Sequence, residues 1–291
     1  MAATLASASH VQPEAHPRPS ITISFENSAK SRRRLAVDDV LNGVKLWRLW
    51  VTLGWTEILQ RYRRSILGPF WLTASMAIMV ISLGILYGEL FRQDISKFMP
   101  FLCVGLLIWG FVSSILNEAG ALFSTHEFFI KQIRLPYTLY VWKFVWSRTI
   151  IFAHNFVIYI ALLFYFNIWP GLPIIAAIGA FLLIIVNALM VSTYYGMISA
   201  RFRDVPQIVA SATQVIFFLT PVLWQPELLG RHRYVADLNP FYHIIEIVRA
   251  PLLGHWPSFT SVIVVSGITL INVMVAAFFF SRFRARIAYW V

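Results

Sequence analysis

Residues 174–199, which read IIAAIGAFLLIIVNALMVSTYYGMIS, form a long apolar run that contains no charged side chain. A helix needs about 20 apolar residues to cross a hydrocarbon core of about 30 Å. Five other segments have this character and length: 67–90, 100–122, 149–168, 206–224 and 260–281. Lipid offers no partner for unpaired backbone groups, so these segments are expected to be helices. The sequence therefore predicts an all-α integral membrane protein with six transmembrane helices.

The composition agrees with a membrane protein, because 58% of the 291 residues are hydrophobic and only 13% are charged. Soluble domains carry about 25% charged residues. The net charge of +11 would suggest nucleic acid in a soluble protein. Here 19 of the 24 Lys and Arg residues precede the first span or lie in the loops 123–148 and 200–205 and the tail. This asymmetry predicts a multi-pass protein of the bacterial inner membrane, with both termini cytoplasmic and no nucleic-acid partner.

Two segments precede the six-span domain, which is assigned to residues 65–291. Residues 1–40 are polar and proline-containing, and are predicted to be a disordered cytoplasmic extension. Residues 41–64 place apolar side chains at helical spacing and predict an amphipathic interface helix on the cytoplasmic leaflet: Trp47, Val51, Trp55, Ile58 and Tyr62. The alternative is an ordinary helix packed on a soluble core.

A shorter helix is predicted outside the membrane, between the fifth and sixth spans. Asn239 is expected to cap its first turn, which Pro240 begins, and Gly254 to end it. Glu246 and Arg249 are three residues apart and are spaced to pair. The segment is too short to cross the bilayer, so we expect a re-entrant or interfacial helix on the periplasmic face. Asn239, Glu246 and Arg249 are its candidate gate residues.

The fifth span carries polar side chains along one face, at Gln207, Ser211 and Gln214, and Phe217, Phe218 and Trp224 continue that face outward. Amides inside a bilayer need a polar partner or a water-filled cavity. Amides bond sugar hydroxyls, and aromatic rings pack on the apolar faces of pyranoses. The face thus suits a path for a sugar polymer. Hydrogen bonding to a neighbouring helix is the alternative, and the sequence leaves both open.

Two cytoplasmic segments combine charged and apolar residues as protein-contact surfaces do. The first contains Glu127, Lys131 and Arg134, and the second contains Arg201, Arg203 and Asp204. Short helices of this kind dock into grooves on soluble partners. The alternative is two solvated turns that obey the positive-inside rule.

Catalytic patterns are missing from the sequence. It has no G-x-x-x-x-G-K-[ST] loop for nucleotide phosphates. His126-Glu127 begins like a zinc-protease motif, but Ile130 replaces the second histidine. No catalytic residue and no metal site is predicted, so the chain is not expected to be an enzyme.

Several motifs together resemble the ABC type-2 permeases that export O-antigen, capsular and teichoic-acid polymers. Residues 61–71, RYRRSILGPFW, are similar to the family's R-Y-[KR]-x-S-x-L-G-x-x-W. Residues 130–136 resemble its first coupling segment, and 201–204 match its R-[FY]-R-D turn. Residues 219–222, 239–241 and 249–252 resemble its fifth-span end and outer loop. The resemblance covers about residues 41–291, and the extension 1–40 has no counterpart.

The resemblance implies a homodimer of six-span subunits above a separate dimer of ABC ATPase subunits. ATP and Mg²⁺ would be bound by that partner, with no cofactor on this chain. Motion would reach the membrane through Glu127, Lys131, Arg134, Arg201, Arg203 and Asp204. The substrate would be an undecaprenyl-diphosphate-linked glycan that enters sideways from the membrane lipid. By analogy, Arg61, Arg63 and Arg64 are candidate diphosphate contacts, with anchoring to anionic lipids as the alternative.

Two other functions compete with glycan export. An ABC type-2 exporter of a drug or small lipid would have a binding pocket rather than an aromatic-lined channel. A membrane glycosyltransferase would need paired carboxylates or a metal site facing a cavity. The acids nearest the spans, Glu89 and Glu118, lie at the ends of different spans, so the enzyme ranks third.

Overall fold

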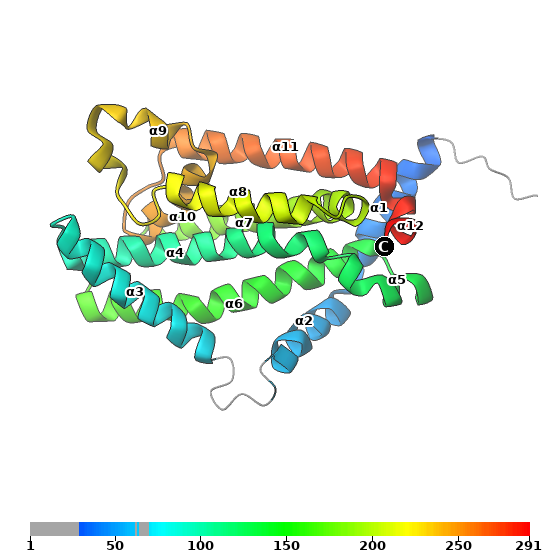
Figure 1. The fold of residues 1–291 in the computed structure, drawn as a ribbon, viewed down its shortest axis with the longest axis horizontal. Helices are drawn as coiled ribbons and strands as arrows, with labels where there is room; N and C mark the ends of the chain where they lie inside the picture. The colour runs from blue at the N-terminus through cyan, green and yellow to red at the C-terminus, as the bar shows by residue number, and fades with distance from the viewer. Residues whose placement is uncertain (1–28, 62, 64–69) are drawn as a thin grey trace, which may run out of the picture.

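The computed structural model in Figure 1 describes residues 29–61, 63 and 70–291, and these residues form helices without any strand. Five helices are long and apolar enough to cross a membrane: α3 (Phe70–Leu90), α4 (Ile95–Glu118), α6 (Tyr137–Phe166), α7 (Ile174–Arg201) and α11 (Phe259–Phe283). The shorter elements are α1 (Ala29–Lys45), α2 (Trp47–Arg61), η1 (Ala119–Ala121), η2 (Ser124–His126), α5 (Glu127–Gln132), α8 (Val205–Leu219), η3 (Pro226–His232), α9 (Tyr234–Asp237), α10 (Pro240–Leu252), η4 (Arg284–Arg286) and α12 (Ile287–Trp290).

The predicted fifth span, 206–224, differs from the helix observed there. α8 ends at Leu219, and Thr220 is extended with φ −93° and ψ 136°. Proline disfavours helical backbone in the residue before it, so Pro221 stops the helix at this point. The resulting 15-residue helix is about 22 Å long, less than the hydrocarbon thickness. The part of the chain that the structure describes thus holds five helices long and apolar enough to span a membrane, and the count of six remains a prediction.

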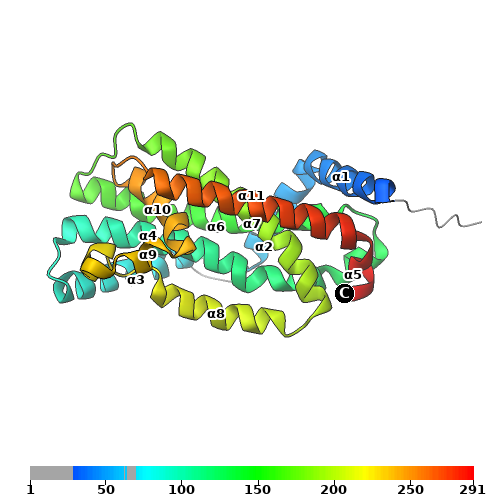
Figure 2. The ribbon, with the colours of Figure 1, turned by 90° about the horizontal axis from the view of Figure 1, so that it is seen from above.

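The two ends of the bundle carry different elements. Figure 1 places α9 and α10 at one end and α1, α5 and α12 at the other, beside the C-terminus. α4 is the most buried of the five long helices and packs on α3, α6, α8 and α10. It is apolar on nearly every face, as expected of a helix enclosed by others. α8 lies at the edge of the bundle in Figure 2, where it packs mainly on α4.

The N-terminal region corrects two sequence-based boundaries. α1 begins at Ala29, so residues 29–40 are helical rather than part of a disordered extension; residues 1–28 lie outside the described residues. The single interface helix expected over 41–64 is instead divided between α1 and α2 at Leu46. α1 packs on α6 and α11. It approaches α6 so closely that a Cβ atom on Gly43 would lie 2.2 Å from Thr138 Oγ1.

Asp39 explains why α1 folds against the bundle. Its side chain is fully buried and accepts hydrogen bonds from the backbone N–H groups of Tyr137 and Thr138, at 3.2 and 3.1 Å. These are orphan donors of the first turn of α6, which a carboxylate stabilises. Arg284 Nε donates to the same carboxylate at 2.6 Å. One side chain thus joins α1 to α6 and to the end of α11.

α2 packs through a different stripe from the one predicted. Trp50 stacks on Trp142 of α6, with ring centroids 5.5 Å apart, and Ile58 is buried two turns later. Trp47 and Trp55 are both about half exposed. The packed face therefore runs through positions 50, 54 and 58, and the other two tryptophans point away from the bundle. That α2 lies at the membrane interface remains a prediction.

Candidate functional site

The two predicted cytoplasmic contact segments lie at the same end of the bundle. The Lys131 ammonium donates to Glu127 across one turn of α5, at 2.6 Å. This bond lowers the pKa of Glu127 below its usual range, and the charge of Arg203 lowers it further. The turn between α7 and α8 lies at the same end of the bundle as α5, as Figure 2 shows, and the charge of Arg203 reaches Glu127. Two segments about 70 residues apart in sequence therefore form one charged surface.

All six predicted contact residues are exposed on this surface: Glu127, Lys131, Arg134, Arg201, Arg203 and Asp204. Phe128 and Phe129 are also exposed and pack edge to face. They were not predicted as separate site residues, although two adjacent phenylalanines on a short helix that also carries Glu127 and Lys131 were the signal. Apolar side chains surrounded by charge are typical of protein-contact sites.

Below this surface, an ionic network ties η2 to the bundle. Lys143 of α6 contacts both His126 Nε2 and Glu57 Oε2, each at 2.9 Å. Arg148, one turn further along α6, contacts Glu57 at 3.6 Å and Glu118 at 3.0 Å. The first contact segment is thereby linked to α2 and to the end of α4.

His126 is held in one tautomer by its neighbours. Its Nδ1 lies 2.8 Å from the Leu122 carbonyl oxygen, which only accepts, while Lys143 only donates to Nε2. The assignment that satisfies both partners is a neutral ring with the proton on Nδ1. Burial lowers the pKa of His126, and the charge of Lys143 lowers it further, against the bond to Leu122. The ring therefore stays neutral next to a lysine.

The polar face predicted on the fifth span is present on α8. Gln207, Ser211 and Gln214 are exposed, whereas Thr213 on the opposite side is buried. Ser211 bonds the backbone oxygen of Gln207 at 3.1 Å. No hydrogen bond from either glutamine amide to a neighbouring helix is present among the described residues. Both amides are therefore placed to form hydrogen bonds with a group outside this chain.

The three aromatic residues of the predicted path take different positions. Phe217 turns inward and packs on Trp109 of α4, with ring centroids 5.5 Å apart. Phe218 is 64% exposed beside the polar face. Trp224 is half-buried, and its Nε1 reaches the Phe218 carbonyl at 3.5 Å. The structure therefore groups Phe218 with Gln214, and leaves Phe217 in the core.

The predicted outer-helix residues join α8 to α10. Asn239 Oδ1 accepts from the Phe241 N–H at 2.9 Å, which confirms its capping role. Its Nδ2 donates to Thr220 Oγ1 at 3.0 Å and to the Leu219 carbonyl at 3.2 Å. The amide thus satisfies a carbonyl at the end of α8 that has no helical partner. Gly254 follows the helix with φ +87°, in the left-handed region that glycine favours.

Arg249 is the most buried charged side chain on this end of the protein, with 1% exposure. It pairs with Glu246, at 2.6 and 2.9 Å, as its spacing predicts. Its Nη1 donates to the Pro221 carbonyl at 2.8 Å, and its guanidinium lies 3.9 Å from the Phe101 ring centroid. These contacts connect α10 to α4 and to the break after α8.

The predicted headgroup arginines are only partly described. Arg61 is the last residue of α2, but its side chain lies outside the described part of the structure, as does the whole of Arg64. Arg63 is exposed in the turn after α2. Their grouping around a diphosphate remains a prediction.

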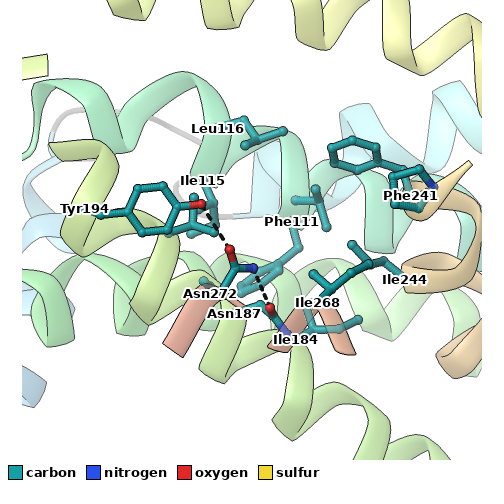
Figure 3. A pocket seen from close by; sticks show the side chains of 14 residues that line it. Phe111, Ile115, Leu116, Ile184, Asn187, Tyr194, Phe241, Ile244, Ile268 and Asn272 are labelled. Carbon is teal, nitrogen blue, oxygen red and sulfur yellow. Dashed lines mark hydrogen bonds between the residues drawn. The ribbon is translucent and has the colours of Figure 1, made fainter. Parts of the chain in front are cut away.

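A polar cluster inside the spans was missed by the sequence analysis (Figure 3). Asn272 of α11 donates to Asn187 Oδ1 of α7 at 2.8 Å and accepts from the Tyr194 hydroxyl at 3.1 Å. Asn187 also donates to Thr269 Oγ1 at 2.7 Å. The cluster borders a largely apolar cavity of about 340 Å³ between α4, α7, α10 and α11. The signal was present, because asparagine is rare in apolar spans and usually bonds across helices.

Five long apolar helices, an exposed polar face on the shorter helix α8 and a charged contact surface at one end are the features of a multi-pass membrane protein of the transporter-permease class. The chain belongs to the ABC-2 type transporter family, whose family profile matches residues 48–253. This confirms the family resemblance found in the sequence motifs. The family implies an ABC ATPase partner that is a separate subunit.

The chain is also similar to curated proteins with one specific name. It is 22% identical over 244 residues to the O-antigen export system permease protein RfbA of Myxococcus xanthus, covering 82% of this chain and 94% of the relative. It is 22% identical over 250 residues to an RfbA of Klebsiella pneumoniae, with the same coverage. Another Klebsiella pneumoniae RfbA matches at 22% over 207 residues, or 69% of this chain and 78% of the relative.

Proposed function

We propose that this chain is the permease subunit of an ATP-driven exporter that moves a lipid-linked polysaccharide, of the O-antigen type, across the bacterial inner membrane. The observation that carries the proposal is the set of relatives named O-antigen export permease, two of which align over 94% of their own length. The charged surface formed by α5 and the α7–α8 turn supports it as the docking site for the ATPase. Both termini would then be cytoplasmic, because α1 and the C-terminus lie at that same end.

The transport path is proposed to form between two copies of the chain. In one copy, Gln207, Gln214 and Phe218 face away from the bundle, on the helix at its edge. Amides exposed at bilayer depth are costly unless water or a polar ligand meets them. Opposed α8 faces in a homodimer would remove that cost and enclose a polar, aromatic path. α8 together with the outer segment up to α10 would complete the sixth crossing.

Deletion of this chain tests the proposal directly. A strain without it is expected to lose the surface polymer and to accumulate the undecaprenyl-diphosphate-linked glycan in the cytoplasmic leaflet. Loss of the partner ATPase should give the same two results. Surface polymer that persists without this chain would contradict the proposal.

A drug or small-lipid exporter is the second candidate, and the cavity in Figure 3 is the observation that favours it. An apolar chamber with a few polar groups is the usual form of a small-molecule site. Filling it by Ala188→Phe is expected to block a small-molecule exporter and to leave glycan export unchanged. Each candidate thus predicts a different result for the same variant.

Changing the charges of the contact surface should impair docking of the ATPase without impairing membrane insertion. Arg134→Glu combined with Asp204→Ala is expected to reduce polymer export about 5- to 150-fold, the range of typical coupling free energies. Both residues are exposed, so the amount of protein in the membrane should be unchanged. Export is measured by surface immunoblot, and ATPase association by co-purification. Arg231→Glu, an exposed charge at the opposite end, is the matched control; equal export in both variants would exclude this surface from coupling.

Substitution on the α8 face tests the path. Gln214→Leu with Phe218→Ala is expected to slow polymer flux about tenfold or more, because a hydroxyl-bonding amide and a stacking ring are lost together, each worth about 1 kcal/mol. Flux is followed by pulse-labelling of the polymer. Phe164→Ala, which removes an equally exposed ring from α6, should have no effect. Unchanged flux in the double variant would show that α8 does not line the path.

A further inference from the structure

The unexpected helix α1 forms a groove with the last turns of α11. A cavity of about 520 Å³ lies between them, and its walls are apolar: Ala36, Val37, Val40, Leu41, Phe278 and Phe280. Figure 2 shows α1 beside this end of α11. Val37, Leu41 and Phe278 are each more than half exposed, although Phe278 belongs to a membrane span. The groove is therefore open to the outside of the bundle, next to the end of a candidate span.

A basic pocket adjoins the groove. Ser281 lines both cavities, and the second one, of about 150 Å³, is lined chiefly by arginines from α1 and from the end of α11: Arg32, Arg282, Arg284 and Arg286. Arg33 stands at the edge of the apolar groove. Residues from opposite ends of the sequence thus bring four arginines to one pocket and a fifth to the adjoining groove.

The positive charge of this pocket is mostly uncompensated. Among the described residues, Arg284 is the only one of the five that pairs with a carboxylate, that of Asp39. Asp38, the other acid on α1, is exposed and lines neither cavity. Grouped like charges repel one another, and a bound anion relieves that repulsion. The Asp39–Arg284 pair joins α1 to the end of α11 beside this pocket.

The distance between the apolar groove and the basic pocket matches the distance between the acyl chains and the phosphate of a lipid. Phe278 in the groove and Arg282 in the basic pocket are four residues apart on α11, or about 6 Å along the helix axis. The headgroup layer of one leaflet is about 5–8 Å thick. A hydrocarbon chain in the groove would therefore place its phosphate among the arginines.

We infer that the groove between α1 and α11 binds an anionic phospholipid of the surrounding bilayer, with an acyl chain against Val40 and Phe278 and the phosphate against Arg32 and Arg282. Basic pockets between membrane helices bind such headgroups in this way. The resident lipid is favoured over the transported one because α1 packs on α6 and α11, whereas α8 packs on α4 and α7. The site depends on membrane insertion and not on polymer export.

Binding is measured by native mass spectrometry of the full-length chain in a neutral detergent. Cardiolipin and phosphatidylglycerol are each titrated against phosphatidylcholine, which has no net charge. We expect the two anionic lipids to bind and phosphatidylcholine to bind at least tenfold more weakly. Arg32→Gln with Arg282→Gln should weaken binding of the anionic lipids about 30-fold, since each basic residue near a charged headgroup contributes about 1 kcal/mol, or about fivefold.

Two further variants control the measurement. Val37→Asp places a carboxylate in the exposed apolar groove without removing an arginine, and should also weaken binding. Arg231→Gln with Arg233→Gln removes two exposed arginines from the opposite end, and should not. The inference would be overturned if Arg32→Gln with Arg282→Gln and Val37→Asp both bound anionic lipids with wild-type affinity. Equal binding of phosphatidylcholine and the anionic lipids to the wild type would also overturn it.

Two other phosphate-containing ligands, undecaprenyl diphosphate and inorganic diphosphate, are titrated in the same experiment. Undecaprenyl diphosphate that binds this site more tightly than cardiolipin would overturn the assignment to a resident lipid. Inorganic diphosphate that displaces cardiolipin at equal concentration would show an anion site without lipid, and would also overturn it. No arm uses the ATPase or the polymer, so failure of the proposed export function leaves these results unaffected.

Discussion

Arg249→Leu is expected to lower the free energy of unfolding by about 3–5 kcal/mol, the usual cost of removing one partner from a buried ion pair. The guanidinium is 1% exposed and satisfies three groups at once: the Glu246 carboxylate, the Pro221 carbonyl and the face of the Phe101 ring. Leucine restores volume but no donor. The Pro221 carbonyl, which is also buried, would then lose its partner.

Unfolding of the Arg249 variant is followed by denaturant titration in detergent micelles. Arg233→Leu is the matched control, because Arg233 also forms ion pairs, with Glu227 and Asp237, but is about half exposed. Exposed pairs contribute about 0–1 kcal/mol, so the control should change little. Adding Glu246→Leu to Arg249→Leu should recover part of the loss, because no unpaired carboxylate remains. Equal losses for Arg249→Leu and Arg233→Leu would contradict the structural role described for this contact.

Asp39→Ala is expected to destabilise the protein by a similar amount, about 3–5 kcal/mol, and to release α1 from the bundle. Its carboxylate is fully buried and accepts from the Tyr137 and Thr138 N–H groups, the Thr138 hydroxyl and Arg284. Alanine would leave two first-turn donors of α6 without a partner, together with a half-buried guanidinium. Asp39→Asn keeps an acceptor but loses the charge, and should fall between alanine and wild type.

Limited proteolysis in detergent measures the release of α1, and denaturant titration measures the loss of stability. Asp38→Ala is the control at the neighbouring exposed position, where changes usually stay within about 0.5 kcal/mol. Rapid cleavage between α1 and α2 is expected only in the Asp39 variants. If Asp39→Ala and Asp38→Ala unfold at the same denaturant concentration, the three-helix contact is not stabilising.

Features that depend on neighbouring residues could be predicted from the sequence. The spans at 174–199 and 260–281 nearly coincide with α7 and α11, because a continuous apolar run is itself the signal for a membrane helix. The Asn239 cap and the Glu246–Arg249 pair were also local, since their partners lie two or three residues away. The early end of α8 could also have been predicted from Pro221, but the apolar run continues past this proline and the predicted span therefore extends to residue 224.

The candidate site likewise combines features that the sequence predicts with features that only helix packing decides. The exposed glutamines of α8 follow from helical spacing, because positions 207, 211 and 214 share one face. That Phe217 packs inward on Trp109 while Phe218 stays exposed was decided by α4. The proximity of Arg203 to Glu127 likewise required two turns to meet at one end of the bundle.

The sequence by itself determined that this protein crosses a membrane on apolar helices, because lipid forces every buried backbone group into local hydrogen bonds. The distribution of basic residues also predicts how those helices are oriented. Only the tertiary structure decided what α1 does, since Asp39 meets Thr138 and Arg284 across 99 and 245 residues of chain. Hydrogen bonds and ion pairs of that range depend on how helices pack, and no local pattern records them. The arginine-lined groove between α1 and α11 exists for the same physical reason.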